Sequence, residues 1–320
     1  MLICAGESLV DLFIADAFET SSVPCFAQPG GSPFNCARAM ARLGADVGFL
    51  GQLSQDAFGQ LLATTLKNDG VTLLNERLVQ NPTALAVIST DAFGHPAYTF
   101  HRTETADRVL NYTHLVDALP ELVSGFQFGS LALAQNSDAK TWSQLALHLK
   151  ERGVFVGVDV NVRLALTDDL ECLLDRLSTV AAMADLLKCS DEDLSLLYPN
   201  MSPEDALFAL QDEHHISLVV MTRGAHGAIA KTLAHEAILV DAPRLNDVVD
   251  TVGAGDTFQA ALMVWLSERL EQPVLQTPDL SADQIRELLS FAHTAAALNC
   301  QRKGCDPPTN EAVQLRLKSI

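Results

Sequence analysis

The sequence predicts an α/β fold built on a mostly parallel central sheet. Short apolar runs rich in β-forming residues alternate with longer helical patterns along the 320 residues. One of these runs, Val154–Val160, is almost continuously apolar, which is typical of a strand buried on both faces. Such alternation predicts parallel strands covered by helices. Because ligands of these sheets bind at the carboxyl ends of the strands, the residues that follow the strands are the first candidates for a site.

The individual elements follow in chain order. Strands are expected at Leu2–Ala5, Val47–Leu50, Phe126–Ser130, Val154–Val160, Leu186–Cys189 and Leu218–Thr222. Helices are expected at Asn35–Leu43, Ala57–Asp69, Asp138–Arg152 and Gln259–Leu270. Gly70 and Gly153 stand where the second and third of these helices should end.

Two segments depart from the alternation. Thr83–Arg102 has the pattern of a hairpin that turns at Asp91–Pro96, and Leu9–Gln28 is β-like and irregular. Together they predict a small second sheet over about 9–28 and 83–108, which we interpret as a lid that keeps water out of a site. An ordinary edge hairpin is the alternative. No repeat or linker divides the chain, so residues 1–320 are interpreted as one catalytic domain with this lid.

The composition excludes several functions. Asp and Glu number 40 against 21 Lys and Arg, so the formal net charge is −19. Nucleic acids and anionic membranes attract clustered positive charge, and neither is an expected partner. The seven cysteines form no CxxC pair, which disfavours a disulfide framework or a zinc site. No apolar run suits a membrane span, and the first residues lack a secretory pattern, so we expect a cytoplasmic protein.

The sharpest motif is DTVGAGDTF at residues 250–258, which is followed by good helix formers. Small residues at a helix start let the backbone approach a ligand, and the free N–H groups there attract an anion. An aspartate at this place would repel a phosphate, unless Asp256 takes a proton from a hydroxyl that attacks a phosphoryl group. The amides of Gly253, Ala254 and Gly255 would then offset the charge of the transition state. The alternative is a glycine-rich turn in which Asp256 only caps the helix.

The glycine pattern excludes two common nucleotide sites. GAGDTF lacks the third glycine of the dinucleotide fingerprint GxGxxG, and the Walker A pattern GxxxxGK[ST] is absent.

A second glycine motif, PGGSPFNCAR at residues 29–38, precedes a helix near the N-terminus. Gly30 and Gly31 permit close approach by a ligand, and the amide of Asn35 both donates and accepts hydrogen bonds. Asp11 follows the first strand, where a strand-end carboxylate is expected. A carboxylate with an amide suits a polyol, since each hydroxyl offers a donor and an acceptor. For Asp11 or Asn35 alone, capping or turn formation is the alternative.

These motifs resemble the two signatures of the ribokinase-like (PfkB) carbohydrate kinase family. The first is PGGSPFNCARAMARLG at residues 29–44, and the second is DTVGAGDTF. GESLVDLF near the start and FAHTAAALNCQRKGCDPPT near the end are also similar to segments of the family, so the resemblance spans essentially the whole chain. It implies a ribokinase-like three-layer sandwich with a β lid, ATP as phosphoryl donor and Mg²⁺ as its companion ion.

The resemblance implies roles for single residues. Asp256 matches the catalytic base, and Gly253, Ala254 and Gly255 match the anion hole. The matched sugar-binding positions are Asp11, Gly30, Gly31 and Asn35. The matched nucleotide-binding positions are Lys188, Ser190, Thr222, Gly224, Gly227 and His293.

Two ion sites are also implied by the resemblance. The family's NxxE is replaced by Ser190-Asp191-Glu192-Asp193, which leaves Asp193 for a water-mediated contact with Mg²⁺. Asp250, Val252 and Gly304 match positions that line a monovalent-cation site, so K⁺ is a candidate. Lid sheets of the family often pair between subunits, because an exposed sheet edge is a liability. A homodimer through the lid is therefore expected.

Two arginines bear on the substrate. DVNVR at residues 159–163 resembles the DPNxR segment of the fructokinase and 2-keto-3-deoxygluconate kinase branches. Arg163 would clamp a phosphoryl oxygen or a substrate group, with a structural salt bridge as the alternative. The segment YTFHRTETADRVL is similar to the fructokinase branch, which implies that Arg102 lies near the substrate.

We therefore expect a fructokinase-like enzyme that moves the γ-phosphoryl group of ATP to a primary hydroxyl of a small sugar, with fructose as the leading substrate. The alternatives within the family are a 2-keto-3-deoxygluconate kinase and an aminoimidazole riboside or nucleoside kinase. From a different class, a non-catalytic sugar or nucleotide sensor is the alternative.

Overall fold

A computed structural model describes residues 1–14, 22–90, 96–167, 169–245, 247–269 and 280–319. Its centre is a nine-stranded sheet with the order β13-β12-β11-β10-β9-β8-β1-β4-β5. The strands are β1 (Leu2–Ala5), β4 (Val47–Leu50), β5 (Thr72–Leu73), β8 (Gly125–Gly129), β9 (Phe155–Asp159), β10 (Leu186–Ser190), β11 (Leu218–Thr222), β12 (Ala228–Thr232) and β13 (Ile238–Val240). Only the pairs of β12 with β11 and β13 are antiparallel, so the predicted mostly parallel sheet is confirmed.

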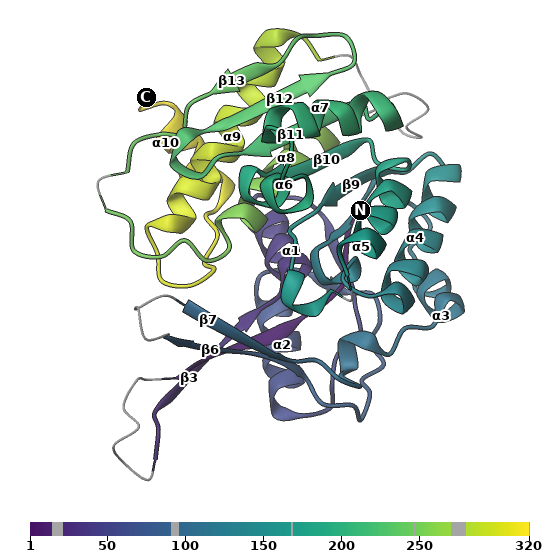
Figure 1. Ribbon diagram of the computed structural model, residues 1–320. Coiled ribbons are helices and arrows are strands. Elements are labelled where there is room, and N and C mark those ends of the chain that lie inside the picture. The colour runs from purple at the N-terminus through teal and green to yellow at the C-terminus, as the bar shows by residue number, and fades with distance from the viewer. Residues whose placement is uncertain (15–21, 91–95, 168, 246, 270–279, 320) are drawn as a thin grey trace.

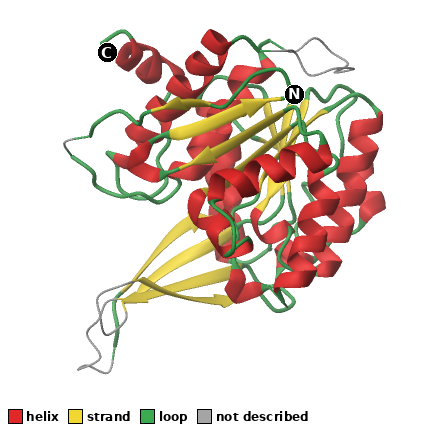
Figure 2. Ribbon diagram, turned by 45° about the horizontal axis from the view of Figure 1, so that its top comes forward, coloured by secondary structure: helices red, strands yellow, loops and turns green. Residues whose placement is uncertain are grey.

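Helices cover both faces of this sheet (Figure 2). The core on one face contains residues of α1 (Ser32–Arg42), α2 (Ala57–Asn68), α8 (Ala254–Ser267), α9 (Ala282–Cys300) and α10 (Asn310–Leu317). The core on the other face contains residues of α3 (Tyr112–Asp117), α4 (Asn136–Glu151), α5 (Leu170–Ala181), α6 (Asp191–Leu197) and α7 (Pro203–His214). Strand β1 shows why both faces are apolar, since Leu2 and Cys4 enter the first core and Ile3 and Ala5 enter the second. This is the predicted three-layer sandwich.

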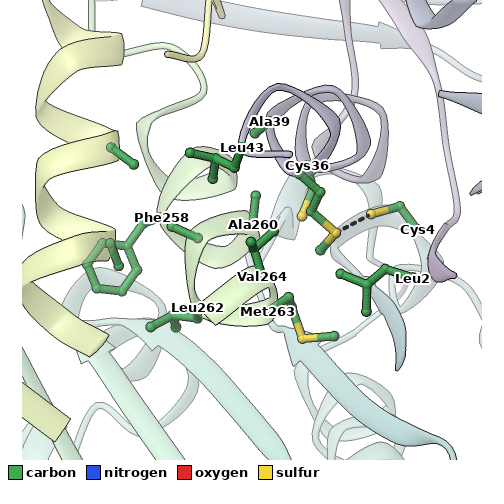
Figure 3. Close-up of a cluster of buried hydrophobic side chains, with 14 of the residues drawn as sticks. Leu2, Cys4, Cys36, Ala39, Leu43, Phe258, Ala260, Leu262, Met263 and Val264 are labelled. Carbon is green, nitrogen blue, oxygen red and sulfur yellow. Dashed lines mark hydrogen bonds between the residues drawn. The ribbon is translucent and has the colours of Figure 1, made fainter. Parts of the chain in front are cut away.

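Helices α1 and α8, which carry the two glycine motifs, pack against each other on the first face (Figure 3). Small side chains face each other in this contact, among them Ala39 on α1 and Ala260 on α8, both fully buried. Small residues let two helix axes approach closely. The N-terminal ends of the two helices are thereby held together, although the motifs are more than 200 residues apart in the sequence.

A separate four-stranded sheet projects from the main body (Figure 1). Its order is β3-β2-β6-β7, with bounds Cys25–Gly30, Leu9–Ile14, Ala84–Thr90 and Pro96–His101. The predicted lid sheet is confirmed, and the turn expected at Asp91–Pro96 lies mostly outside the described residues. Its inner face packs through Leu9, Ala84 and Ala86 on Leu131 and Ala134 of the main body. The lid is therefore anchored to the end of β8.

The predicted element bounds needed two corrections at the functional motifs. Helix α1 begins at Ser32 rather than Asn35, and α8 begins at Ala254 rather than Gln259. Both helices thus start inside the glycine motifs, which places more backbone N–H groups at the site. Within the described residues, no helix has the length and apolarity that crossing a membrane requires.

Candidate active site

A cavity of 690 Å³ lies where the carboxyl ends of the central strands, the start of α8 and the inner face of the lid meet. This is the place at which parallel α/β sheets bind ligands. Many residues predicted from the sequence line it, namely Asp11, Gly31, Asn35, Arg163, Lys188, Ser190, Asp193, Thr222, Val252, Gly253, Gly255 and Asp256. The structure thus brings the two glycine motifs and three strand ends into one wall.

Asp256 is the third residue of α8 and its side chain is buried. Its Oδ1 accepts a hydrogen bond of 2.7 Å from the hydroxyl of Ser32, and its Oδ2 accepts one of 2.8 Å from the amide of Asn35. Burial raises the pKa of Asp256, while these two hydrogen bonds and the cations Lys188 and Arg163 oppose the rise. The N-cap of α8 is Gly253. The alternative reading of Asp256 as a helix cap is therefore wrong.

Of the two glycines before Asp256, Gly253 is the one that the backbone requires. Gly253 has φ +75°, and a Cβ atom there would lie 2.7 Å from Cβ of Cys305. A Cβ on Gly255 would lie 3.6 Å from Nζ of Lys188. The N–H group of Ala254 donates to the carbonyl of Thr251 at 3.2 Å, so the N–H groups of Gly253 and Gly255 at the start of α8 are the ones suited to an anion. Ala254 belongs to this turn, although its side chain does not line the cavity.

Lys188, the middle residue of β10, lines the cavity and is not a free cation. Its ammonium forms a buried ion pair with both carboxylate oxygens of Asp159 at the end of β9, at 2.8 and 2.9 Å. Burial raises the pKa of Asp159 to about 6, and Lys188 opposes that rise. Both groups are therefore charged at neutral pH, and the pair places a local dipole next to the anion-binding turn.

Asp11 lies in the middle of lid strand β2, and not at the end of the first strand as the sequence suggested. Burial raises its pKa to about 6, the charge of Asp256 adds to the rise, and Arg163 opposes it. Its carboxylate covers Gly30, where a Cβ atom would lie 3.0 Å from Cγ of Asp11. Gly30 thus makes room for Asp11 and does not itself line the cavity.

Arg102 is not where the sequence placed it. Its side chain is buried and pairs with Asp107, at 2.5 Å, and with Asp138, at 3.2 Å. It is absent from the lining of the cavity. The two carboxylates already neutralise this guanidinium, so we withdraw it from the predicted substrate contacts. Arg163 does line the cavity, and among the described residues no carboxylate forms an ion pair with it.

The predicted nucleotide residues divide into two groups. Ser190 and Thr222 line the cavity at the ends of β10 and β11. Gly224 and Gly227 form the turn between β11 and β12, and do not line it. His293 on α9 is buried with its ring 5.1 Å from the ring of Phe258, and burial lowers its pKa to about 4. His293 therefore packs within the core as a neutral side chain.

Asp193 has a structural task. Its Oδ2 accepts the N–H of Ser190 at 3.0 Å, and its own N–H donates to the hydroxyl of Ser190 at 3.0 Å, which makes a capping box at the start of α6. Its Oδ1 accepts the N–H of Val162 at 2.8 Å. In place of the family's NxxE, Ser190 and Asp193 form the capping box at which α6 begins. Glu192, the preceding residue, lines the same part of the cavity.

Asp250, Val252 and Gly304 are brought together as predicted. The carboxylate of Asp250 accepts N–H groups of Val252 at 3.0 Å and Gly304 at 2.8 Å. The carbonyl of Val252 accepts the amide of Asn299 at 2.8 Å. This network fixes the loop that leads into Gly253. Among the residues with described positions, no three His, Cys, Asp or Glu side chains form a group that could hold a metal ion.

Several polar lining residues were missed in the sequence, among them Glu7, Ser32, Asn161 and Glu192. Each stands inside a motif quoted above, but residue type alone gave no reason to prefer it to its neighbours. The lid adds Tyr98 and Phe100, whose rings are stacked at 6.4 Å and line the cavity. Their spacing of two along a strand, which puts both on one face, was the signal that could have found them.

Comparison with known proteins agrees with this geometry. Residues 1–312 match the pfkB family of carbohydrate kinases. The chain belongs to that family. It is 31% identical to probable fructokinase-6, chloroplastic, of Arabidopsis thaliana, over 100% of this chain and 83% of the relative.

Solved structures of pfkB kinases show the same fold. The fructokinase of Xylella fastidiosa with bound ATP is 25% identical, with a TM-score of 0.88 over 99% of this chain and 98% of the other. A double mutant of the Vibrio cholerae O395 fructokinase, with fructose, ADP and a potassium ion bound, is 26% identical, with a TM-score of 0.80 over 98% and 97% of the two chains.

Proposed function

We propose that this pfkB kinase transfers the γ-phosphoryl group of ATP to a primary hydroxyl of a small neutral sugar, fructose in the first place, with Asp256 as general base. One observation carries the proposal. The carboxylate of Asp256 is held by Ser32 and Asn35 at the start of α8, beside the N–H groups of the glycine turn and in the wall of the cavity. A base and an anion site are thus adjacent, as phosphoryl transfer to an alcohol requires.

The reaction balances with these groups. The sugar hydroxyl oxygen forms a bond to the γ-phosphorus while its proton passes to the carboxylate of Asp256. The bond between the γ-phosphorus and the oxygen that bridges to the β-phosphate breaks, and ADP leaves with that electron pair. The N–H groups of Gly253 and Gly255 stabilise the charge that collects on the γ-phosphoryl oxygens. The Lys188–Asp159 pair holds a cation near the same turn without carrying excess positive charge into the site.

The residues at the end of β10 fit a hydrated Mg²⁺ that arrives with ATP. Mg²⁺ keeps several waters and is usually bound by one or two carboxylates together with substrate phosphates. Glu192 and Asp193 line this part of the cavity, and both oxygens of Asp193 already accept backbone N–H groups. Glu192 is therefore the better candidate for direct contact, and Asp193 suits a contact through water. When bound, the ion would neutralise the charge of the phosphates.

The charges around the lid end of the cavity favour a neutral acceptor. Glu7, Asp11 and Asp256 contribute three carboxylates to the lining. The cations that line the cavity near them are Arg163 and Lys188, and Lys188 is already paired with Asp159. A polyol can donate hydroxyl protons to the carboxylates and stack its apolar face on Tyr98 and Phe100. An acidic sugar would meet repulsion from the carboxylates. This balance supports fructose over a sugar acid.

A specific observation still supports a second candidate, 2-keto-3-deoxygluconate. The guanidinium of Arg163 lines the cavity and, within the described parts of the chain, has no carboxylate partner. Its Nη1 donates a hydrogen bond of 3.0 Å to the carbonyl of Val162. A free guanidinium is able to bind a carboxylate through two parallel hydrogen bonds. The test must therefore include a sugar acid.

The test measures ADP formation from ATP and Mg²⁺ with fructose, 2-keto-3-deoxygluconate, ribose, aminoimidazole riboside and adenosine as acceptors. We expect the highest kcat/KM with fructose, and a loss of about 10²–10⁴-fold in Asp256→Asn, which is the range that a general base contributes. Glu287→Gln, an exposed substitution on α9, is the matched control and should retain the wild-type rate.

Each other outcome is informative. Faster turnover of the sugar acid would move the substrate to the second candidate and leave the base in place. Substantial turnover by Asp256→Asn would contradict the base. Sugar binding without turnover of any acceptor would contradict the kinase proposal and support a sensor.

We further propose a K⁺ site beside the loop of Asp250, Val252 and Gly304, because this network fixes the backbone directly before Gly253. If only the monovalent cation of the assay is changed, from K⁺ to Na⁺, kcat should then fall. Equal rates in the two salts would contradict the site.

We also propose a cytoplasmic homodimer that pairs through the lid. Strands β3 and β7 are the edges of the lid sheet, and Phe26 and Tyr98 on them are 51% and 53% exposed. Open edges with exposed aromatic rings favour association. Light scattering should give twice the mass of 34.5 kDa, and Phe26→Glu should give the monomer. A wild-type monomer would contradict the proposal.

A further inference from the structure

Asp256 is held by a residue to which no role in this reaction has been assigned. Its Oδ1 accepts the hydroxyl of Ser32 at 2.7 Å, and Asn35 serves only the other oxygen, Oδ2, at 2.8 Å. An ionised carboxylate has about four lone-pair sites, so two donors leave room for an acceptor hydroxyl. Hydrogen bonds to the charged form stabilise it, which matters for a base that is 8% exposed.

Ser32 is itself fixed from outside its own helix. It is the first residue of α1, where a backbone N–H has no partner within the helix, and the N-cap Gly31 makes no side-chain hydrogen bond. Oε1 of Glu7 accepts this N–H at 3.2 Å. Gly31 has φ +108°, and a Cβ atom there would lie 2.9 Å from the carbonyl of Glu7, so the two segments are in close contact.

Glu7 lines the cavity and is deeply buried beside Ser32. Its side chain is 2% exposed, and among the described residues its second oxygen, Oε2, has no hydrogen-bond partner. Burial raises its pKa to about 7, and Arg102 opposes the rise. A buried carboxylate whose second oxygen has no hydrogen-bond partner is costly to keep, which points to a functional reason for its position.

We propose that Ser32 and Glu7 are positioning residues for the base: Ser32 holds the carboxylate of Asp256 in its ionised form and in one orientation, and Glu7 holds Ser32. The inference rests on the proposed function for its meaning in catalysis. The contacts themselves, and their effect on the proton of Asp256, can be tested without turnover.

Other charges act on Asp256 and must be separated from Ser32. The charged and titratable groups that face it come from β2, α1, β9, β10, the loop after β9 and the segment before α10, and they are Asp11, Cys36, Asp159, Lys188, Arg163 and Cys305. A rate profile alone would mix the titrations of Asp11 and Asp256. The proton of Asp256 must therefore be observed directly.

The experiment is a pH titration of the full chain with ¹³C-labelled aspartate carboxyls, observed by NMR. The resonance missing from Asp256→Asn identifies the base. In Ser32→Ala we expect its pKa to rise by about one unit, the effect of losing one charge-assisted hydrogen bond. Ser32→Thr, which keeps the hydroxyl, should restore the wild-type value. No rise in Ser32→Ala, or an equal rise in Ser32→Thr, would overturn the role of the hydroxyl.

The direction in which the pKa of Asp256 changes separates the hold of Glu7 on Ser32 from the effect of its charge. Removal of a negative charge alone would lower the pKa of Asp256, whereas loss of the hold on Ser32 would raise it. Glu7→Gln keeps an oxygen acceptor, so we expect no rise. Glu7→Ala removes it, so we expect a rise that disappears when Ser32→Ala is already present. An additive rise in the double variant would overturn the connection through Ser32.

Kinetics then link the positioning to catalysis. With the acceptor that turns over best, the acidic limb of kcat/KM in Ser32→Ala should move to higher pH by the amount seen in the NMR titration. Its activity should recover as the pH is raised. If Asp256→Asn remains active, the proposed base fails, and the NMR titration still judges the contacts. If Asp256→Asn is inactive and Ser32→Ala shows no shift, this inference alone fails.

Discussion

The ammonium of Lys188, in the middle of β10, meets the carboxylate of Asp159, at the end of the adjacent strand β9, at 2.8 and 2.9 Å. Both side chains are almost fully buried. The pair lies beside the glycine turn that we assign to the γ-phosphoryl group, so its charges are fixed before ATP enters. A cation that is already held needs little rearrangement during the reaction.

Removal of one partner should be costly. In Asp159→Asn the buried ammonium keeps its charge without a counter-ion, and we expect the free energy of unfolding to fall by about 3–5 kcal/mol. Urea denaturation measures it. The exposed pair of Arg286 with Asp283 is the matched control, and Asp283→Asn should change stability by less than about 0.5 kcal/mol. Equal effects of the two substitutions would contradict this account of the buried pair.

The glycine turn offers a sharper test of the anion site. Gly253→Ala introduces a Cβ at φ +75° that must displace Cys305, so we expect kcat to fall by more than about tenfold as the N–H groups move. Gly70→Ala is the control, since Gly70 has φ +86° and open space around it. It should lose about 1 kcal/mol of stability and no activity. A wild-type kcat in Gly253→Ala would show that the turn does not bind the transferred group.

Arg163 should separate the two substrate classes. With fructose, we expect Arg163→Met to lower kcat/KM by at most about tenfold, because a neutral sugar offers the guanidinium only hydroxyl groups. With 2-keto-3-deoxygluconate, the loss of a charged hydrogen bond should cost about 10- to 100-fold more. Steady-state kinetics with both acceptors, and with Arg286→Met as the exposed control, measure the difference. Equal losses for the two acceptors would remove Arg163 from carboxylate recognition.

Glu7 should make stability depend on pH. Its pKa is raised from 4.5 to about 7, so the folded protein holds this proton more tightly than the unfolded chain does. The stabilisation is complete below about pH 4.5 and is lost as the pH rises through about 7. Glu7→Gln removes this titration. The free energy of unfolding of the variant minus that of the wild type should therefore be about 1–3 kcal/mol larger at pH 8.5 than at pH 5.5.

Urea unfolding at these two pH values measures the effect of Glu7. Asp11, with a pKa raised to about 6, contributes a loss of the same sign over a lower pH range in both proteins, and so cancels in the comparison. A difference between the two proteins that does not change with pH would contradict the assignment.

Local sequence patterns predicted much of this structure. The apolar runs predicted the central strands, and the two glycine motifs predicted the place of Asp256 and Asn35, because glycines at a helix start let the backbone approach a ligand. Where the sequence failed, the deciding partner was distant. Arg102 is neutralised by Asp107 and Asp138, and Asp193 is engaged by Val162, contacts that only the folded chain creates.

Charge balance within the cavity also escaped the sequence. Lys188 was expected at a nucleotide-binding position, and its pairing with Asp159 follows from the register of β9 and β10. Glu7 and Ser32 were visible in their motifs, but nothing in residue type indicates that one residue accepts a backbone N–H from the other. Such contacts depend on how two loops pack, which periodicity does not encode.

The contact between α1 and α8 also has a consequence for the chain while it is being synthesised. Asn35 and Asp256 are 221 residues apart, so a ribosome releases the sugar-binding half of the cavity long before it makes the base. A nascent chain that ends before α8 lacks the carboxylate that we propose as the base. We therefore expect no phosphoryl transfer until α8 has been made and has packed against α1.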